Sequence, residues 1–473
     1  MLNLYFLRRM QVRNFSVKVE VKLDDDVNTL LENDLLKHRH HPGIIKPRFV
    51  EVPDWIKNSI EIVLEDSKIS KSYLSNGGQK LMQHLLGRNI SNVEPNLQNE
   101  EKKLQASMHP SNLYKMDKNI NEFNININPK LYNEKRQLHN STNIAIDYNR
   151  QTGLLYIVGR SQYEYSVVYK VLNQIKSKSI NFKPQTLFDF GSGIGTVMWA
   201  ASQLWSDSLK EYFGVDSSIE MNDLSEEINK YNTHPIKNIF YRQFLPAVPV
   251  PTYDIVVSSF SLLELPDMKT RFNVIQKLWA KAQKYLVIIE DGTNAGFTAV
   301  NEARDIVLYN IFESNDNNNN CAHVLAPCPH DMKCPRYYTD EIPCNFETSY
   351  YTLPLLGPSL LKKQRFSYVI LKKDIRSDSD KQWPRVVQPT LKRSRHVICR
   401  TCTANGKLEE IIFTSYKYGK NAYRCARVSR WGDLLPIEIS KNNLIGSVLM
   451  NWQEVGIMGL VYIIMSHVQD FHQ

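Results

Sequence analysis

The chain carries seven cysteines, all in its last third: Cys321, Cys328, Cys334, Cys344, Cys399, Cys402 and Cys425. Three of them follow the spacing Cys328-x5-Cys334-x9-Cys344, with prolines beside them, and the pair Cys399-x2-Cys402 comes later. Clustered cysteines in a large chain with no apparent secretory signal indicate metal or cluster ligation more than disulfides. Four thiolates can complete a tetrahedral zinc site or hold a [4Fe–4S] cluster.

The cysteine spacing leaves other readings open. It is looser than the paired C-x2-C knuckles of a zinc ribbon, so zinc is an alternative that the pattern does not specifically indicate. His323 and His330 are alternative ligands. Free structural cysteines are the third reading, because a reduced cysteine packs as a small apolar side chain.

A second chemical signature is the glycine-rich turn Asp189-Phe190-Gly191-Ser192-Gly193-Ile194-Gly195. Glycines between a strand and a helix allow a sharp turn and a close approach of backbone N–H groups to a ligand. The dinucleotide-binding fingerprint places its third glycine one residue later than Gly195. The spacing and Asp189 resemble the first motif of class I methyltransferases, which implies that this turn faces the methionine part of S-adenosylmethionine.

Asp216 ends the next apolar segment, in the sequence FGVDSS. A carboxylate at this strand end can accept hydrogen bonds from both ribose hydroxyls of a nucleotide cofactor. The alternative role is an N-cap for the helix that follows. The glycine turn at a suitable distance upstream favours the ribose role.

Two absences argue against methyl transfer. No Asp or Glu lies between Tyr241 and Tyr253 to contact the adenine amino group. The segment DIVVSSFSLLELP, over 254–266, has neither the Asn/Asp-Pro-Pro-Tyr pattern of amino methyltransferases nor a Pro-Cys nucleophile. Glu264 and Glu290 are available acids, although each is equally suited to a capping role.

Positioning these groups requires alternating strands and helices. Apolar runs predict five strands, at 186–190, 211–216, 239–244, 253–262 and 285–291. Helices are expected at 163–175 and 196–205, so the pattern predicts a parallel, doubly wound sheet over 146–310. Residues 21–90 are predicted to be helical and 91–145 to be polar loop. Asn405-Gly406 predicts a type I′ hairpin within a cysteine-rich, β-containing subdomain over 311–440.

Both ends of the chain are atypical. The first 20 residues include Arg8, Arg9 and Arg13 and no acid before Glu20, which is typical of a mitochondrial presequence. The alternative is a basic leader without a targeting role. The tail 441–473 contains the apolar run GIMGLVYIIM, which is too short to cross a bilayer comfortably, so no stable membrane span is expected.

The net charge of +9 favours anionic partners. Basic residues gather in the cysteine-rich segment: Lys362, Lys363, Arg365, Lys372, Lys373, Lys392, Arg393, Arg395, Lys417, Lys420, Arg424, Arg427 and Arg430. Tyr416, Tyr418, Tyr423 and Trp431 lie among them. Phosphate neutralisation combined with aromatic stacking is typical of RNA binding, and a solvated basic face is the alternative.

Three segments, APCPHDMKCP, WPRVVQPTLKRSRHV and YRCARVSRWGDLLP, resemble the mitochondrial ribosomal small-subunit methyltransferase-like family. The resemblance covers most of residues 145–435. It implies a matrix protein that binds the assembling mitochondrial small ribosomal subunit and its rRNA as a monomer. It also implies an S-adenosylmethionine-type fold with little or no methyl transfer, and a [4Fe–4S] cluster. The implied ligands are Cys328, Cys334, Cys344 and Cys402, the last because the family has a Cys shortly after a His-Val pair, which is matched to His396, Val397 and Cys402.

The leading hypothesis is therefore a mitochondrial small-subunit assembly factor with a class I methyltransferase-like Rossmann fold. An active S-adenosylmethionine-dependent rRNA methyltransferase is the first alternative. A zinc-bearing, RNA-binding scaffold with an empty cofactor pocket is the second.

Overall fold

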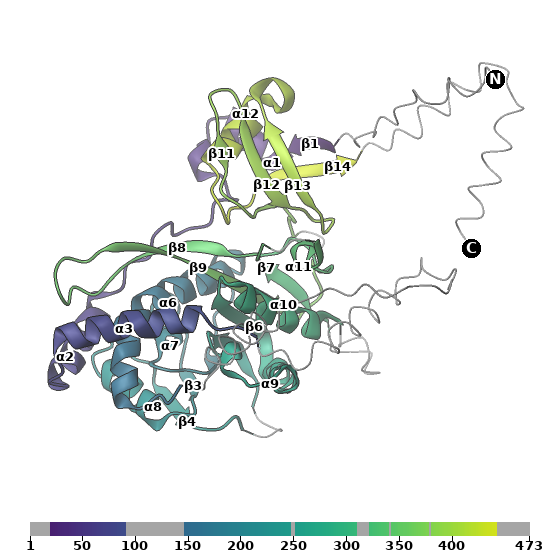
Figure 1. The fold of residues 1–473 in the computed structure, drawn as a ribbon. Helices are drawn as coiled ribbons and strands as arrows, with labels where there is room; N and C mark the ends of the chain where they lie inside the picture. Colours follow the sequence, from purple (N-terminus) through teal and green to yellow (C-terminus); the bar gives the residue numbers. More distant parts are fainter. Residues whose placement is uncertain are drawn as a thin grey trace, which may run out of the picture.

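The computed structural model describes residues 19–90, 146–246, 251–309, 321–339, 342–377 and 380–441. They form a large α/β body and a smaller body that lies against one of its ends (Figure 1). The expectations for residues 1–18, for the polar segment 91–145 and for the tail beyond 441 lie outside the described residues.

A twisted sheet of eight strands forms the centre of the large body. Its strands are β2 (Thr186–Phe190), β3 (Glu211–Val215), β4 (Asn238–Arg242), β5 (Tyr253–Ser259), β6 (Ala282–Asp291), β7 (His323–Ala326), β8 (Phe346–Tyr351) and β9 (Leu361–Lys372). The order is β4-β3-β2-β5-β6-β9-β7, and β8 also pairs with β9. The strands from β4 to β6 are parallel, whereas β9 is antiparallel to β6 and to β7. This is the class I methyltransferase-like topology, so the expected fold class is confirmed.

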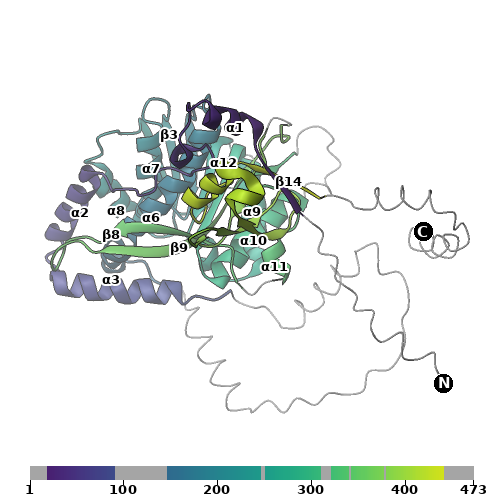
Figure 2. The same ribbon diagram turned by 90° about the horizontal axis from the view of Figure 1, so that it is seen from above.

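Helices cover both faces of the sheet (Figure 2). They are α2 (Asp54–Asp66), α3 (Lys71–Leu86), α6 (Arg150–Lys178), α7 (Thr196–Leu204), α8 (Ile219–Asn229), α9 (Met268–Lys281), α10 (Asn294–Tyr309) and the short α11 (Pro335–Thr339). Alternate residues of each strand enter two separate cores, one under α6 and α7 and the other under α9 and α10. Burial on both faces explains why β5 and β6 read as continuous apolar runs.

Within the large body, helix α3 packs on α6, whereas α2 packs on α8. A Cβ atom built on Gly159 would lie 2.4 Å from the carbonyl oxygen of Gly78, so the backbones of α3 and α6 approach more closely than any side chain would permit. Helix α6 spans 29 residues and is longer than the helix expected at 163–175. Helix α3 therefore covers the outer side of α6.

The smaller body, here called the terminal subdomain, consists of residues 19–48 together with 380–441. It contains β1 (Val19–Leu23), α1 (Asp25–Glu32), the 3-10 turn η2 (His38–His40), β10 (Arg385–Val386), β11 (Leu391–Lys392), β12 (Val397–Cys402), β13 (Leu408–Phe413), α12 (Ser415–Val428) and β14 (Ile437–Lys441). Strand β1 pairs antiparallel with β14, where helix was expected from residue 21. The two ends of the described chain therefore share one small core.

An ion pair fastens the N-terminal segment to this subdomain. Arg48 donates to both carboxylate oxygens of buried Asp433, at 2.8 and 2.7 Å. The backbone N–H of Ile45 donates to the same carboxylate, and that of Leu434 donates to the carbonyl of Gly43. These bonds join residues almost 390 positions apart in the sequence, which the local pattern could not reveal.

The hairpin expected at Asn405-Gly406 joins β12 and β13, but its turn differs from the expected type. Only Gly406 has a positive φ, of 64°, whereas a type I′ turn requires two such residues. The N–H of Gly406 donates to the carbonyl of Thr403, and the N–H of Thr403 donates to the carbonyl of Lys407. The loop between Thr403 and Lys407 is therefore one residue longer than a type I′ loop. It is a type I turn followed by a glycine bulge at Gly406. Among the described helices, none has both the length and the apolar character needed to cross a membrane.

Candidate cofactor crevice and cysteine centre

The glycine-rich turn lies where the sheet reverses its order. β2 has β3 on one side and β5 on the other, and the carboxyl ends of the strands at such a reversal of strand order are where open α/β sheets bind their ligands. Gly191, Gly193 and Gly195 have φ values of 71°, 51° and 86°. All three positions favour glycine, and Gly195 is the N-cap of α7. The turn thus has a backbone conformation that glycine adopts without strain, directly before a helix.

Asp216 lies beside this turn, as the expected ribose role requires. Its carboxylate accepts the N–H of Gly193 at 2.8 Å and that of Ser218 at 3.0 Å. Burial raises the pKa of Asp216 above its ordinary value, although both N–H groups oppose the shift. Ser218, not Asp216, caps α8 by accepting the N–H of Met221. A helix-capping role therefore does not account for Asp216.

Asp189 lies below the turn and is fully buried. The hydroxyl of Tyr212 donates to one carboxylate oxygen at 2.7 Å, and the other oxygen has no hydrogen-bond partner among the described residues. Desolvation raises the pKa of Asp189 to about 7. The structure thus brings Asp189 and Asp216 to the same turn, with Asp189 fully buried and Asp216 half-buried.

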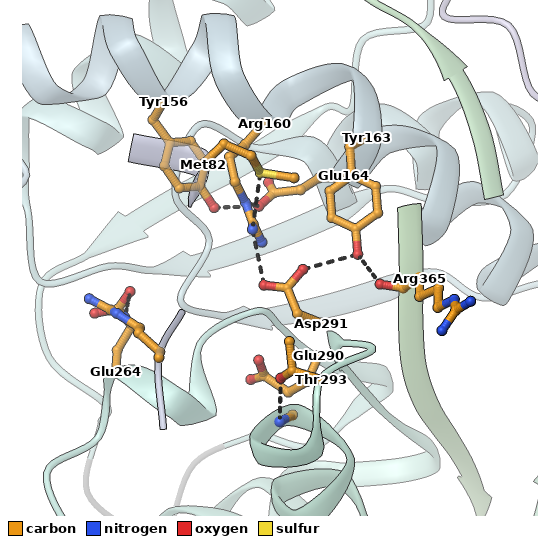
Figure 3. A network of polar contacts seen from close by, with 12 residues as sticks. Met82, Tyr156, Arg160, Tyr163, Glu164, Glu264, Glu290, Asp291, Thr293 and Arg365 are labelled. Atoms are coloured by element: carbon orange, nitrogen blue, oxygen red, sulfur yellow. Dashed lines mark hydrogen bonds and ion pairs between the residues drawn. The ribbon is translucent and has the colours of Figure 1, made fainter. Parts of the chain in front are cut away.

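A buried charged network joins α6 to the end of β6 (Figure 3). Arg160, on α6, donates to Glu164 and to Asp291 at 3.0 Å each. The hydroxyl of Tyr163 donates to Asp291, and that of Tyr156 donates to Glu164. Attraction to both acids outweighs the burial of Arg160 and raises its pKa. None of these charges was identified from the sequence: Arg160 and Glu164 resemble ordinary surface residues of a helix, and Asp291 is the last residue of an apolar strand.

The two acids noted in the sequence, Glu264 and Glu290, border the same network. Glu264 forms an ion pair with Arg88 and accepts the hydroxyl of Tyr148 at 2.8 Å. Glu290 accepts the N–H of Leu262 at 2.7 Å, and burial raises its pKa to about 8. Both acids therefore hold the loop that follows β5.

The four cysteines chosen as ligands come together. Cys328, Cys334, Cys344 and Cys402 line one small cavity, together with Pro327, Pro335, Arg336, Phe346, Arg385, Val387 and Leu408. Cys402 comes from the end of β12 in the terminal subdomain, whereas the other three come from the segment after α10. All four are free thiols. Two sequence-distant segments thus converge on one small cavity lined by four thiols.

The surroundings of the cavity suit a negatively charged group. Burial raises the pKa of the Cys328 thiol and that of Cys334, the latter to about 11. Buried Arg304 lowers both, and Arg385 also lowers the pKa of Cys328. Four thiolates would leave an anionic centre even with a metal bound, and two buried guanidinium groups would offset that charge. The sequence did not single out either arginine for this role.

The remaining cysteines and histidines are placed differently. Cys399 and Cys425 are buried in the apolar core of the terminal subdomain, and Cys321 is exposed. His330 Nε2 lies 3.2 Å from the sulfur of Cys402, whereas His323 Nδ1 lies 2.8 Å from the carbonyl oxygen of Asp374. His330 is thus a neighbour of the cysteine set. Within the described ranges, no group of three or more Cys, His, Asp or Glu side chains is arranged to hold a single metal ion.

Exposed basic residues form a patch on the terminal subdomain. Lys420, Arg424 and Arg427 recur at helical spacing on α12, and Arg427 donates to the carbonyl of Arg393 at 2.8 Å. Partial burial, together with the repulsion of Arg430 and Arg427, lowers the pKa of nearby Lys392. In the part of the chain that the structure describes, none of the basic residues Lys392, Arg393, Lys420, Arg424 and Arg427 forms an ion pair, and all but the half-buried Arg427 are exposed.

Comparison with solved structures finds methyltransferases. A putative RNA methyltransferase from Pyrococcus horikoshii is 15% identical, with a TM-score of 0.27, over 44% of this chain and 85% of that one. Magnesium protoporphyrin IX methyltransferase from Synechocystis, with bound SAM, is also 15% identical, with a TM-score of 0.29, over 48% of this chain and 85% of that one. The fold assignment depends on the strand order described above and not on these likenesses.

Comparison with curated proteins finds ribosome assembly proteins. The human "Ribosome assembly protein METTL17, mitochondrial" is 35% identical over 85% of this chain and 86% of its own length. The Schizosaccharomyces pombe "Rsm22-cox11 tandem protein 2, mitochondrial" is 28% identical over 60% of this chain and 43% of its own length. The family model "Mitochondrial small ribosomal subunit Rsm22" matches residues 150–436. The chain therefore belongs to the Rsm22 family of mitochondrial small ribosomal subunit proteins.

Proposed function

We propose that this chain is a mitochondrial assembly factor for the small ribosomal subunit that binds rRNA through its terminal subdomain. The observation that carries the proposal is the similarity to a mitochondrial ribosome assembly protein over 86% of that protein's length. The basic patch around α12 and Arg393 supports it, because phosphate neutralisation supplies most of the affinity of sequence-independent RNA binding.

Within this proposal, Cys328, Cys334, Cys344 and Cys402 hold a [4Fe–4S] cluster. The donor set fits, since the four thiols line one cavity beside buried arginines. The cluster would supply charge neutralisation and a covalent link between the two bodies, so that part of its binding free energy becomes folding free energy. The cysteines would release their protons on binding, because burial holds their thiols neutral.

The glycine turn and Asp216 would hold S-adenosylmethionine in the same proposal. The positive φ values leave the backbone of Gly193 open, with only Met221 within 4 Å of a Cβ at that position. Asp216 lies at the strand end suited to ribose hydroxyls. No acid with an adenine-binding position was found in the sequence, and the loop after β5 carries no methyl-transfer motif, so we assign the glycine turn and Asp216 a binding role with little or no methyl transfer.

The metal hypothesis is tested by anaerobic purification with iron, zinc and sulfide analysis. We expect a broad brown absorption and iron with sulfide in the wild-type protein, and the loss of both in Cys334→Ser. Cys321→Ser is the matched control, because Cys321 is exposed and outside the cavity. Stoichiometric zinc without iron would refute the cluster and leave the zinc-bearing scaffold.

The RNA hypothesis is tested by binding to small-subunit rRNA at several salt concentrations. Replacing Arg393, Lys420 and Arg424 with Glu should weaken binding and reduce the salt dependence, by about 0.7 to 0.9 in the log–log slope for each phosphate that the variant no longer neutralises. Exposed Lys80, Lys183 and Lys230, on the large body, provide the matched control. If both triple variants bind small-subunit rRNA with equal affinity, the basic patch is not the rRNA-binding surface.

A further inference from the structure

His330 is a buried histidine whose ring meets the sulfur of a candidate cluster ligand. It is 1% exposed, and its Nε2 atom lies 3.2 Å from the Sγ atom of Cys402. The two residues are 72 positions apart in the sequence and belong to different bodies: His330 follows β7 of the large body, whereas Cys402 ends β12 of the terminal subdomain. The contact therefore forms only where the two bodies meet.

The other ring nitrogen of His330 leaves the ring proton free to lie toward the sulfur. Nδ1 has no hydrogen-bond partner among the described residues. The carbonyl of Met332 is close to the imidazole, but it accepts the guanidinium group of Arg304 instead. A neutral imidazole carries one N–H, and its position is set by the hydrogen bonds that the two nitrogens make. Nε2 can therefore donate to a sulfur that only accepts.

The loop that carries His330 is held in place by side chains from both bodies. Four carbonyls between residues 327 and 332 accept side-chain hydrogen bonds: those of Pro327, Pro329, His330 and Met332. The donors are Arg385 and Gln382 of the terminal subdomain and Arg304 of α10. A loop fixed at so many points holds the imidazole against Cys402.

We propose that His330 is a positioning residue that donates a hydrogen bond from Nε2 to the Cys402 thiolate and thereby stabilises the cluster held by the four cysteines. A thiolate ligand has no proton to give, so the imidazole N–H must be the donor. Hydrogen bonds to charged acceptors are stronger than those between neutral groups, and hydrogen bonds to the sulfurs help to set the reduction potential of an iron–sulfur centre. The proposal rests on the cluster assigned under the proposed function and adds a residue outside the ligand set.

Two competing explanations make different predictions. In the first, His330 only fills space in a buried loop, so that its shape matters and its N–H does not. In the second, His330 is itself a ligand in place of Cys402. Only a hydrogen-bonding His330 should be replaced well by another N–H donor and poorly by an apolar ring.

The variants separate the ring from the donor. His330→Phe keeps a planar ring without an N–H, whereas His330→Gln keeps a side-chain N–H in a different shape. His323→Phe is the matched control, because His323 is similarly buried, at 2% exposure, but its Nδ1 contacts the carbonyl of Asp374 and not a cysteine. Each full-length protein is purified anaerobically, and its iron and sulfide are measured.

We expect His330→Phe to hold iron about ten- to a hundredfold less tightly than the wild-type protein against a chelator, which is the usual effect of losing the partner of a metal ligand. Its midpoint potential in an anaerobic dithionite titration should be more negative, because the reduced cluster carries more negative charge for the N–H to stabilise. His330→Gln should stay close to wild type in both measurements, and His323→Phe should match wild type. Equal iron retention and equal potential in wild type and His330→Phe would overturn the proposal, and so would a His330→Gln variant as weak as His330→Phe.

A measurement on the wild-type protein covers variants that do not fold. Pulsed electron paramagnetic resonance of the reduced cluster, in protein made with ¹⁵N-labelled histidine, detects nitrogen nuclei close to the unpaired spin. The N–H···S contact should give a weak coupling to one histidine nitrogen. A strong coupling would identify a histidine ligand, and the absence of coupling would show that His330 does not contact the centre. Either result overturns the proposal.

Failure of the proposed function gives a different result. Wild-type protein without iron and sulfide would overturn the cluster and this inference with it. Wild-type protein with a cluster that His330→Phe leaves unchanged would overturn the inference alone, and the cluster and the assembly role would stand.

Discussion

Replacing Asp189 with Asn should change how the stability of the protein depends on pH. The carboxyl group is fully buried beneath the glycine turn, and its only hydrogen bond among the described residues comes from Tyr212. Desolvation raises its pKa from 3.8 to about 7. At neutral pH the group is therefore close to half protonated in the folded protein and fully ionised in the unfolded chain.

The sign of the effect follows from proton binding. Between pH 3.8 and about 7 the folded state holds a proton that the unfolded state has lost, so stability falls as the pH rises. The contribution is fully present below pH 3.8 and is lost as the pH passes through about 7. A shift of this size corresponds to about 4 kcal/mol, at 1.36 kcal/mol per pKa unit.

The assay is urea unfolding of the wild-type protein and Asp189→Asn between pH 4 and pH 8. The difference in unfolding free energy between the two proteins should change by up to about 4 kcal/mol in favour of the variant as the pH rises. Glu290 and Glu164 also have raised pKa values, so the difference between the two proteins, and not the wild-type curve alone, carries the test. Exposed Asp207→Asn is the control. Parallel curves for wild type and Asp189→Asn would show that Asp189 stays ionised, and would refute the reasoning.

Three further outcomes are expected. Gly193→Asp should abolish S-adenosylmethionine binding in calorimetry, because it strains a positive-φ position and places a second acid beside Asp216. Unchanged affinity would show that the glycine turn does not bind S-adenosylmethionine. Arg48→Ala should lower the unfolding free energy by about 2 to 3 kcal/mol, since buried Asp433 loses two charged hydrogen bonds. A loss below about 0.5 kcal/mol in urea unfolding would contradict a stabilising role of the Arg48–Asp433 ion pair. A reporter fused to residues 1–30 should enter mitochondria and be shortened, and a cytosolic, full-length reporter would contradict the presequence.

Much of the architecture could be read from the sequence, because the signals were local. The strands at Thr186–Phe190 and Glu211–Val215 were apolar runs flanked by helical patterns, and burial on both faces of a parallel sheet requires such runs. The glycine turn was recognisable because positive φ values restrict residue choice at each of its three glycines. The family resemblance supplied the choice of Cys402 over Cys399, and burial of Cys399 in an apolar core agrees with that choice.

The amino-acid sequence alone determined the succession of elements, the turn that a cofactor would need and the two groups of cysteines from which the family resemblance selected the four candidate ligands. The tertiary structure alone decided the pairing of β1 with β14, the convergence of Cys402 on the other three cysteines and the position of Arg160 against Asp291. The physical reason is the range of the interactions. A turn or an amphipathic strand is specified by neighbours in the chain, whereas a buried charge acquires its meaning only from partners that folding brings to it from distant positions.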